Sequence, residues 1–303
     1  MNGKDLISIR DLERKDIEAL FSLAEKMEGE IGGSKTPLKG SVVSTLFFEP
    51  STRTRLSFQA AAQRLGADVI NFESVAFTSM AKGETFVDTI KIIDGYADLI
   101  VMRHHLEGAA RLAANIAKHP VVNGGDGGNQ HPTQTLIDLY TIRKIKKKIA
   151  GLNVHLVGDL KYARTMRSLL YGLGMFGANV KLVSPKGLEM DKRIVDEAKE
   201  LFSIKVEQTH ELSLKDADVT YVCRIQKERF ADQYEAEKLQ REFKITEELL
   251  KGVKDDLVIL HPLPKIDEID PAVDTSKHAT YFEQARLGVP MRMAILMKLL
   301  GGT

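Results

Sequence analysis

The sequence predicts an α/β protein of two domains, each built on a mainly parallel sheet flanked by helices. The chain has 303 residues, which is long for a single core and suits two domains of about 150 residues each. Short apolar runs rich in β-branched residues alternate with segments whose apolar residues recur at helical spacing. This alternation restarts after Gly151, as expected for a second set of strand–helix–strand units.

The first half of the chain opens with a helix over 11–27, in which Ile17, Leu20 and Ala24 form an apolar stripe. After it, strands are predicted at 42–46, 67–70, 98–102 and 121–123, and helices at 56–65, 86–96 and 107–118. Residues 124–130 are predicted to be a loop, because four glycines in five residues oppose both a helix and a strand.

The second half begins with a helix that opens near His131 and crosses a domain boundary placed at 131–135. Beyond it, strands are predicted at 154–157, 180–183, 218–222 and 257–260, and helices at 164–176, 191–202 and 292–300. Ligands of parallel sheets bind at the carboxyl ends of the strands. We therefore expect an active site in the crevice between the two domains, lined by the polar residues that follow the strands.

The composition is that of a globular protein from a reducing compartment. Hydrophobic residues make up 43% of the chain and the net charge is +1, so an anion site must be local and neither nucleic acid nor membrane is an expected partner. The single cysteine, Cys223, excludes an internal disulfide. No signal peptide or membrane-length apolar stretch is evident, so we expect a cytoplasmic protein.

A strand-to-helix turn at 49–55 is the candidate phosphate site. Ser51 and Thr52 lie where the first buried strand passes into a helix, whose first N–H groups and dipole favour an anion. Arg53 and Arg55 add guanidinium donors that match phosphate oxygens. The alternative is an ordinary capping Ser/Thr pair with two solvated arginines, but two arginines in one turn favour the phosphate site.

Other strand ends also carry basic and polar side chains. Arg103, Arg164 and Arg224 have few carboxylates near them in sequence, which indicates a substrate with several negative charges. His131 follows the glycine-rich loop, with Gln134 one turn on, and an imidazole there can donate to a carbonyl oxygen as charge develops on it. No cysteine nucleophile or Ser/His/Asp order is evident, so we expect direct transfer without a covalent enzyme intermediate. No metal-ligand spacing is evident either, and we expect neither a metal nor a cofactor.

Residues 79–84 lie in a stretch without clear periodicity. Lys82 precedes Gly83 there, and this pattern suits either a solvated lysine or a mobile anion clamp. Both interpretations stay open on the residues alone.

Together, these motifs resemble the aspartate/ornithine carbamoyltransferase family over essentially the whole chain. The family's phosphate signature is matched by Ser-Thr-Arg-Thr-Arg at 51–55, and a second motif by His-Pro-Thr-Gln-Thr-Leu at 131–136. Ornithine-type members carry His-Cys-Leu-Pro in the second domain, whereas residues 261–264 read His-Pro-Leu-Pro. Residues 224–229 read Arg-Ile-Gln-Lys-Glu-Arg, the aspartate-type segment, and its arginines suit a carboxylate and would repel a cationic side chain. The resemblance therefore favours the aspartate type.

The resemblance implies a role for each matching residue. Carbamoyl phosphate would contact the phosphate turn, other strand ends and a loop of a neighbouring subunit, namely Ser51, Thr52, Arg53, Thr54, Arg103, His131, Gln134, Ser79 and Lys82. Catalysis would use Arg53, Thr54, Arg103, His131 and Lys82. Aspartate would be bound through its carboxylates and amine by Arg164, Arg224, Gln226, Lys82 and the backbone of Leu263 and Pro264. Glu49 and Arg229 would take part in domain closure.

The resemblance also implies the domains and the reaction. A carbamoyl phosphate-binding domain over 1–133 would be joined by the C-terminal helix 291–303, and an aspartate-binding domain would cover 134–290. The reaction would convert carbamoyl phosphate and L-aspartate into N-carbamoyl-L-aspartate and phosphate, the committed step of de novo pyrimidine biosynthesis. The aspartate amine would attack directly, through a tetrahedral intermediate, and no cofactor is implied.

The implied assembly is a homotrimer with active sites shared between subunits. Residues 107–113 are similar to a segment of catalytic chains that assemble with a zinc-bearing regulatory chain, which predicts an allosteric partner. An amphipathic surface helix is the alternative interpretation of this segment.

Other functions stay open. A carbamoyltransferase for another amino acid, including the ornithine type, would need only a changed contact to the second substrate. A non-catalytic anion-binding α/β protein would explain the sheets and the phosphate turn, but not His131, Gln134 or the arginines of the second domain. A dinucleotide enzyme is disfavoured because residues 124–128 lack the G-x-G-x-x-G spacing.

Overall fold

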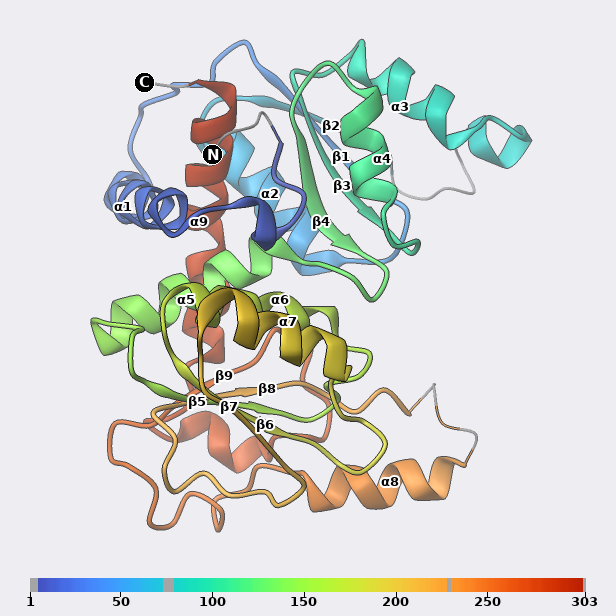
Figure 1. Cartoon of the computed structure of the whole chain (residues 1–303). Helices are drawn as coiled ribbons and strands as arrows, with labels where there is room; N and C mark the ends of the chain where they lie inside the picture. The colour runs from blue at the N-terminus through green and yellow to red at the C-terminus, as the bar shows by residue number, and fades with distance from the viewer. Residues whose placement is uncertain (1–4, 73–78, 228–229, 231, 302–303) are drawn as a thin grey trace. The chain divides into compact units, whose positions relative to one another are not determined.

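The computed structural model describes residues 5–72, 79–227, 230 and 232–301 of the chain. The chain forms two compact units (Figure 1). Unit 1 consists of Met1–Ile137 and Leu287–Thr303, and unit 2 of Asp138–Arg286. Two helices, α5 (Pro132–Lys146) and α9 (Tyr281–Leu300), contain the points at which the chain passes from one unit to the other.

Unit 1 contains a parallel sheet whose strands lie in the order β2-β1-β3-β4. Its elements are η1 (Ile9–Asp11), α1 (Arg14–Glu30), β1 (Val42–Phe47), α2 (Thr52–Arg64), β2 (Asp68–Phe72), η3 (Ser79–Lys82), α3 (Phe86–Asp94), β3 (Leu99–His104), α4 (Ala109–Ile116) and β4 (Val121–Asp126). Helices α3 and α4 cover one face of the sheet and α2 covers the other (Figure 1). Leu46, Ile90 and Ile100 are buried in the core on the α3/α4 side.

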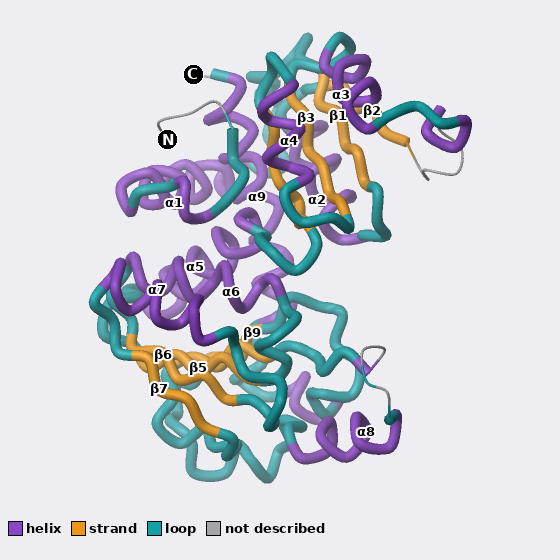
Figure 2. The backbone as a smooth tube through the Cα atoms, turned by 45° about the vertical axis from the view of Figure 1, so that its right-hand side comes forward, coloured by secondary structure: helices purple, strands orange, loops and turns teal. Residues whose placement is uncertain are grey.

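Unit 2 contains a second parallel sheet, in the order β7-β6-β5-β8-β9. Its elements are β5 (Asn153–Val157), α6 (Arg164–Met175), β6 (Asn179–Val183), α7 (Lys192–Phe202), β7 (Val206–Thr209), β8 (Val219–Val222), α8 (Gln233–Glu242), β9 (Val258–Leu260) and η5 (Pro271–Thr275). Helices α6 and α7 lie side by side on one face, and α8 lies on the other side of the sheet (Figures 1 and 2). Two parallel sheets flanked by helices confirm the predicted fold class.

Strand β4 shows that the prediction of a loop over 124–130 was wrong at its start, because the glycines at 124 and 125 continue the strand. A Cβ at Gly124 would lie 3.0 Å from the Met102 carbonyl oxygen, so the absent side chain allows β3 and β4 to approach closely. The Gly125 amide donates to Asn123 Oδ1 at 2.7 Å, where the register of the two strands shifts. The Asn123 side chain therefore supports a strand conformation at residues 124 and 125, which two consecutive glycines disfavour.

Strand β7 and helix α8 were not predicted. Strand β7 lies at the edge of the sheet, and its Glu207 and Gln208 are exposed, so it has no apolar run to detect. Helix α8 is similarly polar, with the sequence QYEAEKLQRE, and its stability depends on packing that a local pattern does not report.

Helix α9 begins well before the predicted residue 292 and contains Gly288 and Pro290, two residues that usually interrupt helices. A Cβ at Gly288 would lie 2.6 Å from Arg292 Nη1, so glycine leaves room for that side chain. The Arg292 guanidinium in turn lies over the Phe58 ring, 5.0 Å from its centroid. None of the described helices, α9 included, has the length and hydropathy of a bilayer span.

Candidate active site

The amino end of α2 keeps its first amides free of side-chain capping. Ser51 is the N-cap residue, but its hydroxyl makes no capping hydrogen bond to the helix. Its Oγ instead accepts a hydrogen bond from Arg103 Nη1 at 3.2 Å. Thr52 and Arg53 in the first turn are exposed. Uncapped amides at the positive end of a helix dipole favour an anionic ligand.

Arg103 is held beside this helix end by a second contact. It lies on β3 in register with Phe47, and its Nε donates to Glu49 Oε1 at 2.5 Å. Only 17% of the Arg103 side chain and 22% of the Glu49 side chain are exposed. These contacts restrict the orientation of the Arg103 guanidinium, and a donor of fixed orientation is suited to stabilising an anion. The structure thus brings Glu49, Ser51 and Arg103 together.

Two other residues of the phosphate turn differ in environment. Thr54 is buried in the first turn of α2, whereas Arg53 is exposed. Partial desolvation of the guanidinium lowers the pKa of Arg53, but an arginine remains charged at neutral pH. Burial restricts the Thr54 side chain, whereas the exposed Arg53 side chain is accessible to an anion from solvent.

His131 lies at the start of α5 and is 4% exposed. Its carbonyl oxygen accepts from the amides of Gln134 at 3.0 Å and Thr135 at 3.2 Å, which sets the first turn of the helix. Its Nδ1 lies 3.4 Å from Thr133 Oγ1. Gln134 is partly buried and lies one turn further along. The backbone positions of His131 and Gln134 are therefore both set by the first turn of α5.

Asp126 anchors the loop that leads to His131, and sequence reasoning missed it. Its carboxylate is 1% exposed and accepts from the Gln130 amide at 3.1 Å, Asn129 Nδ2 at 3.0 Å and the Gly108 amide at 2.9 Å. An aspartate among glycines is a common sign of a side chain that closes its own turn, and this signal was available in the sequence.

The Lys82 side chain is not brought to this cluster. Ser79 and Lys82 lie in η3, and the Lys82 residue is exposed. Within the described ranges, no hydrogen bond or ion pair joins Lys82 to another residue of unit 1. Contacts within the described part of this chain therefore do not test its predicted role as an anion clamp.

In unit 2, the ends of β5 and β8 come very close together. Gly158 has a φ of +118°, and a Cβ there would lie 2.2 Å from the Cys223 carbonyl oxygen, so this position requires glycine. Arg224 follows directly after Cys223, and Arg164 is the first residue of α6, which follows β5. Two predicted aspartate ligands therefore lie on segments that leave adjacent strands at their carboxyl ends.

Cys223 itself is buried between these segments. Burial raises the pKa of the Cys223 thiol well above 9. Its Sγ–H donates to the Asp159 carbonyl oxygen at 3.3 Å. A protonated, buried thiol does not act as a nucleophile, so this residue has a packing role.

Residues 261–264 follow β9 and contain an unusual backbone. Leu263 has a φ of +55°, and the Leu263–Pro264 peptide bond is cis. A left-handed conformation costs a non-glycine residue roughly 1–2 kcal/mol, so the surrounding contacts must hold it. Gln226, another predicted aspartate ligand, is partly buried after β8. Arg229 lies outside the described residues.

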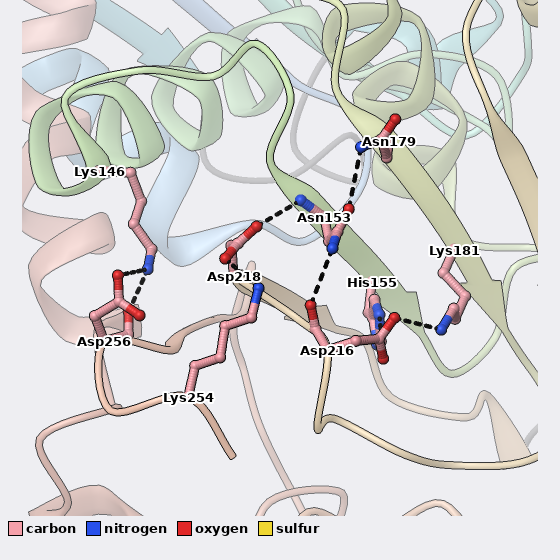
Figure 3. Close-up of polar contacts among 9 residues, drawn as sticks. All are labelled: Lys146, Asn153, His155, Asn179, Lys181, Asp216, Asp218, Lys254 and Asp256. Atoms are coloured by element: carbon pink, nitrogen blue, oxygen red, sulfur yellow. Dashed lines mark hydrogen bonds and ion pairs between the residues drawn. The ribbon is translucent and has the colours of Figure 1, made fainter.

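A separate polar hollow of about 120 Å³ lies at the amino ends of β5 and β6, in the sheet of unit 2. Figure 3 shows polar contacts among residues that line it, including Asn153, His155 and Asp216. Within it, Lys181 Nζ donates to Asp216 Oδ2 at 2.7 Å. His155 is 1% exposed, and its Nδ1 lies 3.1 Å from the Ser213 carbonyl oxygen. Desolvation lowers the pKa of His155, so the ring is neutral at pH 7. Among the described residues, no group of three or more His, Cys, Asp or Glu side chains is arranged to hold a metal ion.

Comparison with known families identifies the fold and the motifs. Residues 4–144 match the family model "Aspartate/ornithine carbamoyltransferase, carbamoyl-P binding domain". Residues 150–299 match the model "Aspartate/ornithine carbamoyltransferase, Asp/Orn binding domain". The chain belongs to the aspartate/ornithine carbamoyltransferase family. The resemblance seen in the motifs at 51–55 and 131–136 is thereby confirmed.

Relatives within this family are similar over nearly the whole chain. The aspartate carbamoyltransferase catalytic subunit of Thermococcus kodakarensis is 52% identical over 303 residues, which covers 99% of this chain and 97% of that protein. The catalytic subunit of Methanopyrus kandleri is 51% identical over 305 residues, covering 99% and 98% respectively. Both belong to the aspartate type, in agreement with the segments at 224–229 and 261–264.

Solved structures of the same family have the same fold. The catalytic subunit of M. jannaschii aspartate transcarbamoylase has a TM-score of 0.91 and 46% identity, covering 99% of this chain and 98% of that one. Aspartate transcarbamoylase from Trypanosoma cruzi, solved in complex with carbamoyl phosphate and aspartate, has a TM-score of 0.91 and 37% identity, covering 97% and 94%.

Proposed function

We propose that this chain is an aspartate carbamoyltransferase catalytic chain, which converts carbamoyl phosphate and L-aspartate into N-carbamoyl-L-aspartate and phosphate in de novo pyrimidine biosynthesis. The observation that carries the proposal is the contact of Arg103 with Ser51 and Glu49 at the uncapped amino end of α2, inside the family's phosphate motif. Relatives about 50% identical over the whole chain, named aspartate carbamoyltransferase catalytic subunit, support it.

The phosphate group of carbamoyl phosphate binds at the start of α2. Backbone amides of the first turn, the hydroxyls of Ser51 and Thr52 and the guanidinium of Arg53 donate to its oxygens. The exposure of Arg53 is consistent with a side chain that closes over the ligand. Because the phosphate departs in the reaction, these donors also stabilise the leaving group.

The carbonyl group of carbamoyl phosphate is polarised by three residues with limited freedom. Arg103 and His131 donate to its oxygen, and the buried Thr54 hydroxyl adds a third donor. Gln134 binds the carbamoyl amide. Donors fixed before the reaction stabilise the oxyanion of a tetrahedral intermediate without the cost of reorientation.

Aspartate binds to residues of unit 2. Arg164 and Arg224 bind its two carboxylates, with Gln226 beside them, because guanidinium groups match carboxylate geometry. The backbone at Leu263 and Pro264 binds the α-amine. Arginines at these strand ends attract the side-chain carboxylate of aspartate and repel the cationic side chain of ornithine, so the site favours aspartate.

The reaction is a direct substitution at the carbamoyl carbon. The neutral α-amine of aspartate attacks this carbon and forms a C–N bond, and the carbonyl electrons move to the oxygen. The intermediate then re-forms the C=O bond as the C–O bond to phosphate breaks, and the departing phosphate accepts the amine proton. Holding two anions in reacting geometry and stabilising the oxyanion are the main contributions of the protein.

Assembly and regulation form a second part of the proposal. In a homotrimer, Ser79 and Lys82 of a neighbouring subunit complete each active site, which agrees with the exposure of Lys82 in the single chain. Glu49 and Arg229 take part in domain closure. Helix α4 contacts a zinc-bearing regulatory chain, which makes the enzyme allosteric, and its exposed Leu112 suits such a contact. The location is cytoplasmic.

The assay that tests the activity measures phosphate release from carbamoyl phosphate with either aspartate or ornithine as the acceptor. We expect release that depends on aspartate and no increase above background with ornithine. Release that depends on ornithine would assign the chain to the other branch of the family. Sedimentation of the purified chain tests the trimer separately, and a monomer with full activity would exclude shared sites.

A further inference from the structure

The segment 262–264 offers a ligand only hydrogen-bond acceptors. Proline has no N–H group, so Leu263 carries the single backbone donor between Pro262 and Pro264. That N–H is already used, because it donates to His261 Nδ1 at 2.8 Å. Within the part of the chain that the structure describes, no hydrogen bond reaches the carbonyl oxygens of these three residues. The segment therefore favours a ligand group that is rich in donors.

The imidazole of His261 has a defined tautomer. Since Nδ1 accepts from the Leu263 amide, the ring proton is on Nε2. Nε2 lies 2.7 Å from Glu268 Oε1, to which it donates. The side chains of His261 and Glu268 are 2% and 3% exposed. This buried pair therefore contacts segment 262–264 through the Leu263 amide and is shielded from solvent.

Glu268 is held as a carboxylate. Its second oxygen, Oε2, accepts from the amides of Ile266 and Asp267, both at 3.1 Å. Burial alone would raise the pKa of Glu268, but the hydrogen bonds from His261 and from the backbone amides outweigh it, and the pKa lies below its usual 4.5. An ionised Glu268 accepts on both oxygens and so keeps the proton of His261 on Nε2.

The backbone of His261 is fixed as well. Its amide donates to Gln284 Oε1 at 2.9 Å, and Gln284 Nε2 donates to Asp138 Oδ1 at 2.6 Å. Gln284 and Asp138 are 1% and 0% exposed. The chain of contacts from α5 and α9 to His261 holds the strained Leu263 backbone in one position.

We propose that His261 and Glu268 are positioning residues that occupy the Leu263 amide and so turn segment 262–264 into an acceptor-only site for a primary amine. This inference rests on the proposed function, in which the amine is that of aspartate. A neutral amine that donates both N–H groups to carbonyl oxygens keeps its lone pair directed away from them, toward an electrophile. A free Leu263 N–H would instead compete for that lone pair.

Variants that separate the two nitrogens of His261 test the proposal. His261→Asn places an oxygen near the position of Nδ1 and retains an acceptor for the Leu263 amide. His261→Gln reaches toward Glu268 but leaves that amide without its acceptor. Glu268→Gln replaces one carboxylate oxygen by an N–H₂ group, which faces donors: the His261 Nε2–H or the amides of Ile266 and Asp267. It thereby disturbs the hydrogen bond that fixes the tautomer of His261. His155→Asn is the matched control, a buried histidine at the opposite edge of the same sheet (Figure 3).

Two measurements are made on each full-length variant. Hydrogen exchange of the Leu263 amide, the single exchangeable amide of segment 262–264, reports positioning without reference to catalysis. Steady-state kinetics report the KM for aspartate, the KM for carbamoyl phosphate and kcat. We expect His261→Gln and Glu268→Gln to exchange the amide roughly tenfold faster and to raise the aspartate KM by about tenfold or more, with little change in the carbamoyl phosphate KM.

His261→Asn should keep the amide protected and stay within about threefold of the unchanged chain in aspartate KM. His155→Asn should change neither quantity. Equal exchange in every variant, or an aspartate KM that responds to His261→Asn as strongly as to His261→Gln, would overturn the positioning role. If His261→Gln does not fold, Glu268→Gln decides the question. An unchanged chain that carbamoylates no aspartate would reject the proposed function, while amide exchange would still test His261.

Discussion

Replacing Arg103 by methionine should strongly reduce kcat without unfolding the protein. Methionine keeps much of the aliphatic length of arginine and removes the guanidinium. In the structure this group donates from Nε to Glu49 at 2.5 Å and from Nη1 to Ser51 at 3.2 Å, and the side chain is 17% exposed. The substitution therefore removes a preoriented donor and leaves the Glu49 carboxylate without this partner.

The size of the effect follows from these contacts. Loss of one preorganised donor at a developing oxyanion costs about 2.7–4 kcal/mol in the transition state, or about 10²–10³ in kcat. Loss of a partner for a largely buried carboxylate costs a further roughly 1–3 kcal/mol of folding free energy. We therefore expect Arg103→Met to reduce kcat by at least about a hundredfold and to lower the denaturation midpoint modestly.

Steady-state phosphate release and a denaturant titration measure the two effects. Arg14→Met serves as the control, since it makes the same substitution in an exposed pair, where Arg14 Nε lies 2.9 Å from Glu18. That control should retain kcat within about twofold, because exposed ion pairs contribute little. A kcat for Arg103→Met within about threefold of the unchanged chain would refute the assigned role of Arg103.

Four further predictions concern other parts of the molecule. Arg53→Ala should abolish most turnover with little change in the melting temperature, because this side chain is exposed; full activity would exclude the phosphate role. His131→Ala should lower kcat more than it raises either KM, and the reverse pattern would argue against oxyanion stabilisation. Gly158→Ala should lower the free energy of unfolding by about 2–5 kcal/mol, measured by denaturant, because its φ is +118° and a Cβ would lie 2.2 Å from the Cys223 carbonyl oxygen. Burial opposes ionisation of Asp94, but backbone amides lower its pKa below 3.8. Its stabilisation is therefore complete above about pH 4 and is lost as pH falls through the lowered pKa. The stability difference between Asp94→Asn and the unchanged chain should shrink below about pH 4, and a difference that is constant down to pH 2 would contradict this.

Features with a local cause were predictable from the sequence. Strand β1 is a short, mostly apolar run, and helix α2 begins directly after Ser51, so hydrophobic periodicity located the strand-to-helix turn at 49–55. The parallel arrangement of both sheets followed from the alternation of strands and helices. The positions of Arg103, Arg164 and Arg224 at strand ends followed from the same rule.

Features that depend on distant partners were not predictable. The strand conformation of Gly124 depends on β3, which the local composition does not report. The Leu263 amide is occupied by His261. The ring of His261 is oriented by Glu268 and its backbone amide is held by Gln284, which lie 7 and 23 residues further along the chain. Each of these contacts forms only when the sheet of unit 2 brings separate segments together.

Isotope labels in both substrates show directly whether the carbamoyl group is transferred to aspartate. Carbamoyl phosphate labelled with ¹³C is incubated with the protein and ¹⁵N-labelled aspartate, and the product is examined by NMR. We expect a one-bond ¹³C–¹⁵N coupling between the carbamoyl carbon and the aspartate nitrogen, formed in step with phosphate release. Phosphate release with unmodified aspartate and a ¹³C label found only in hydrolysis products would contradict it.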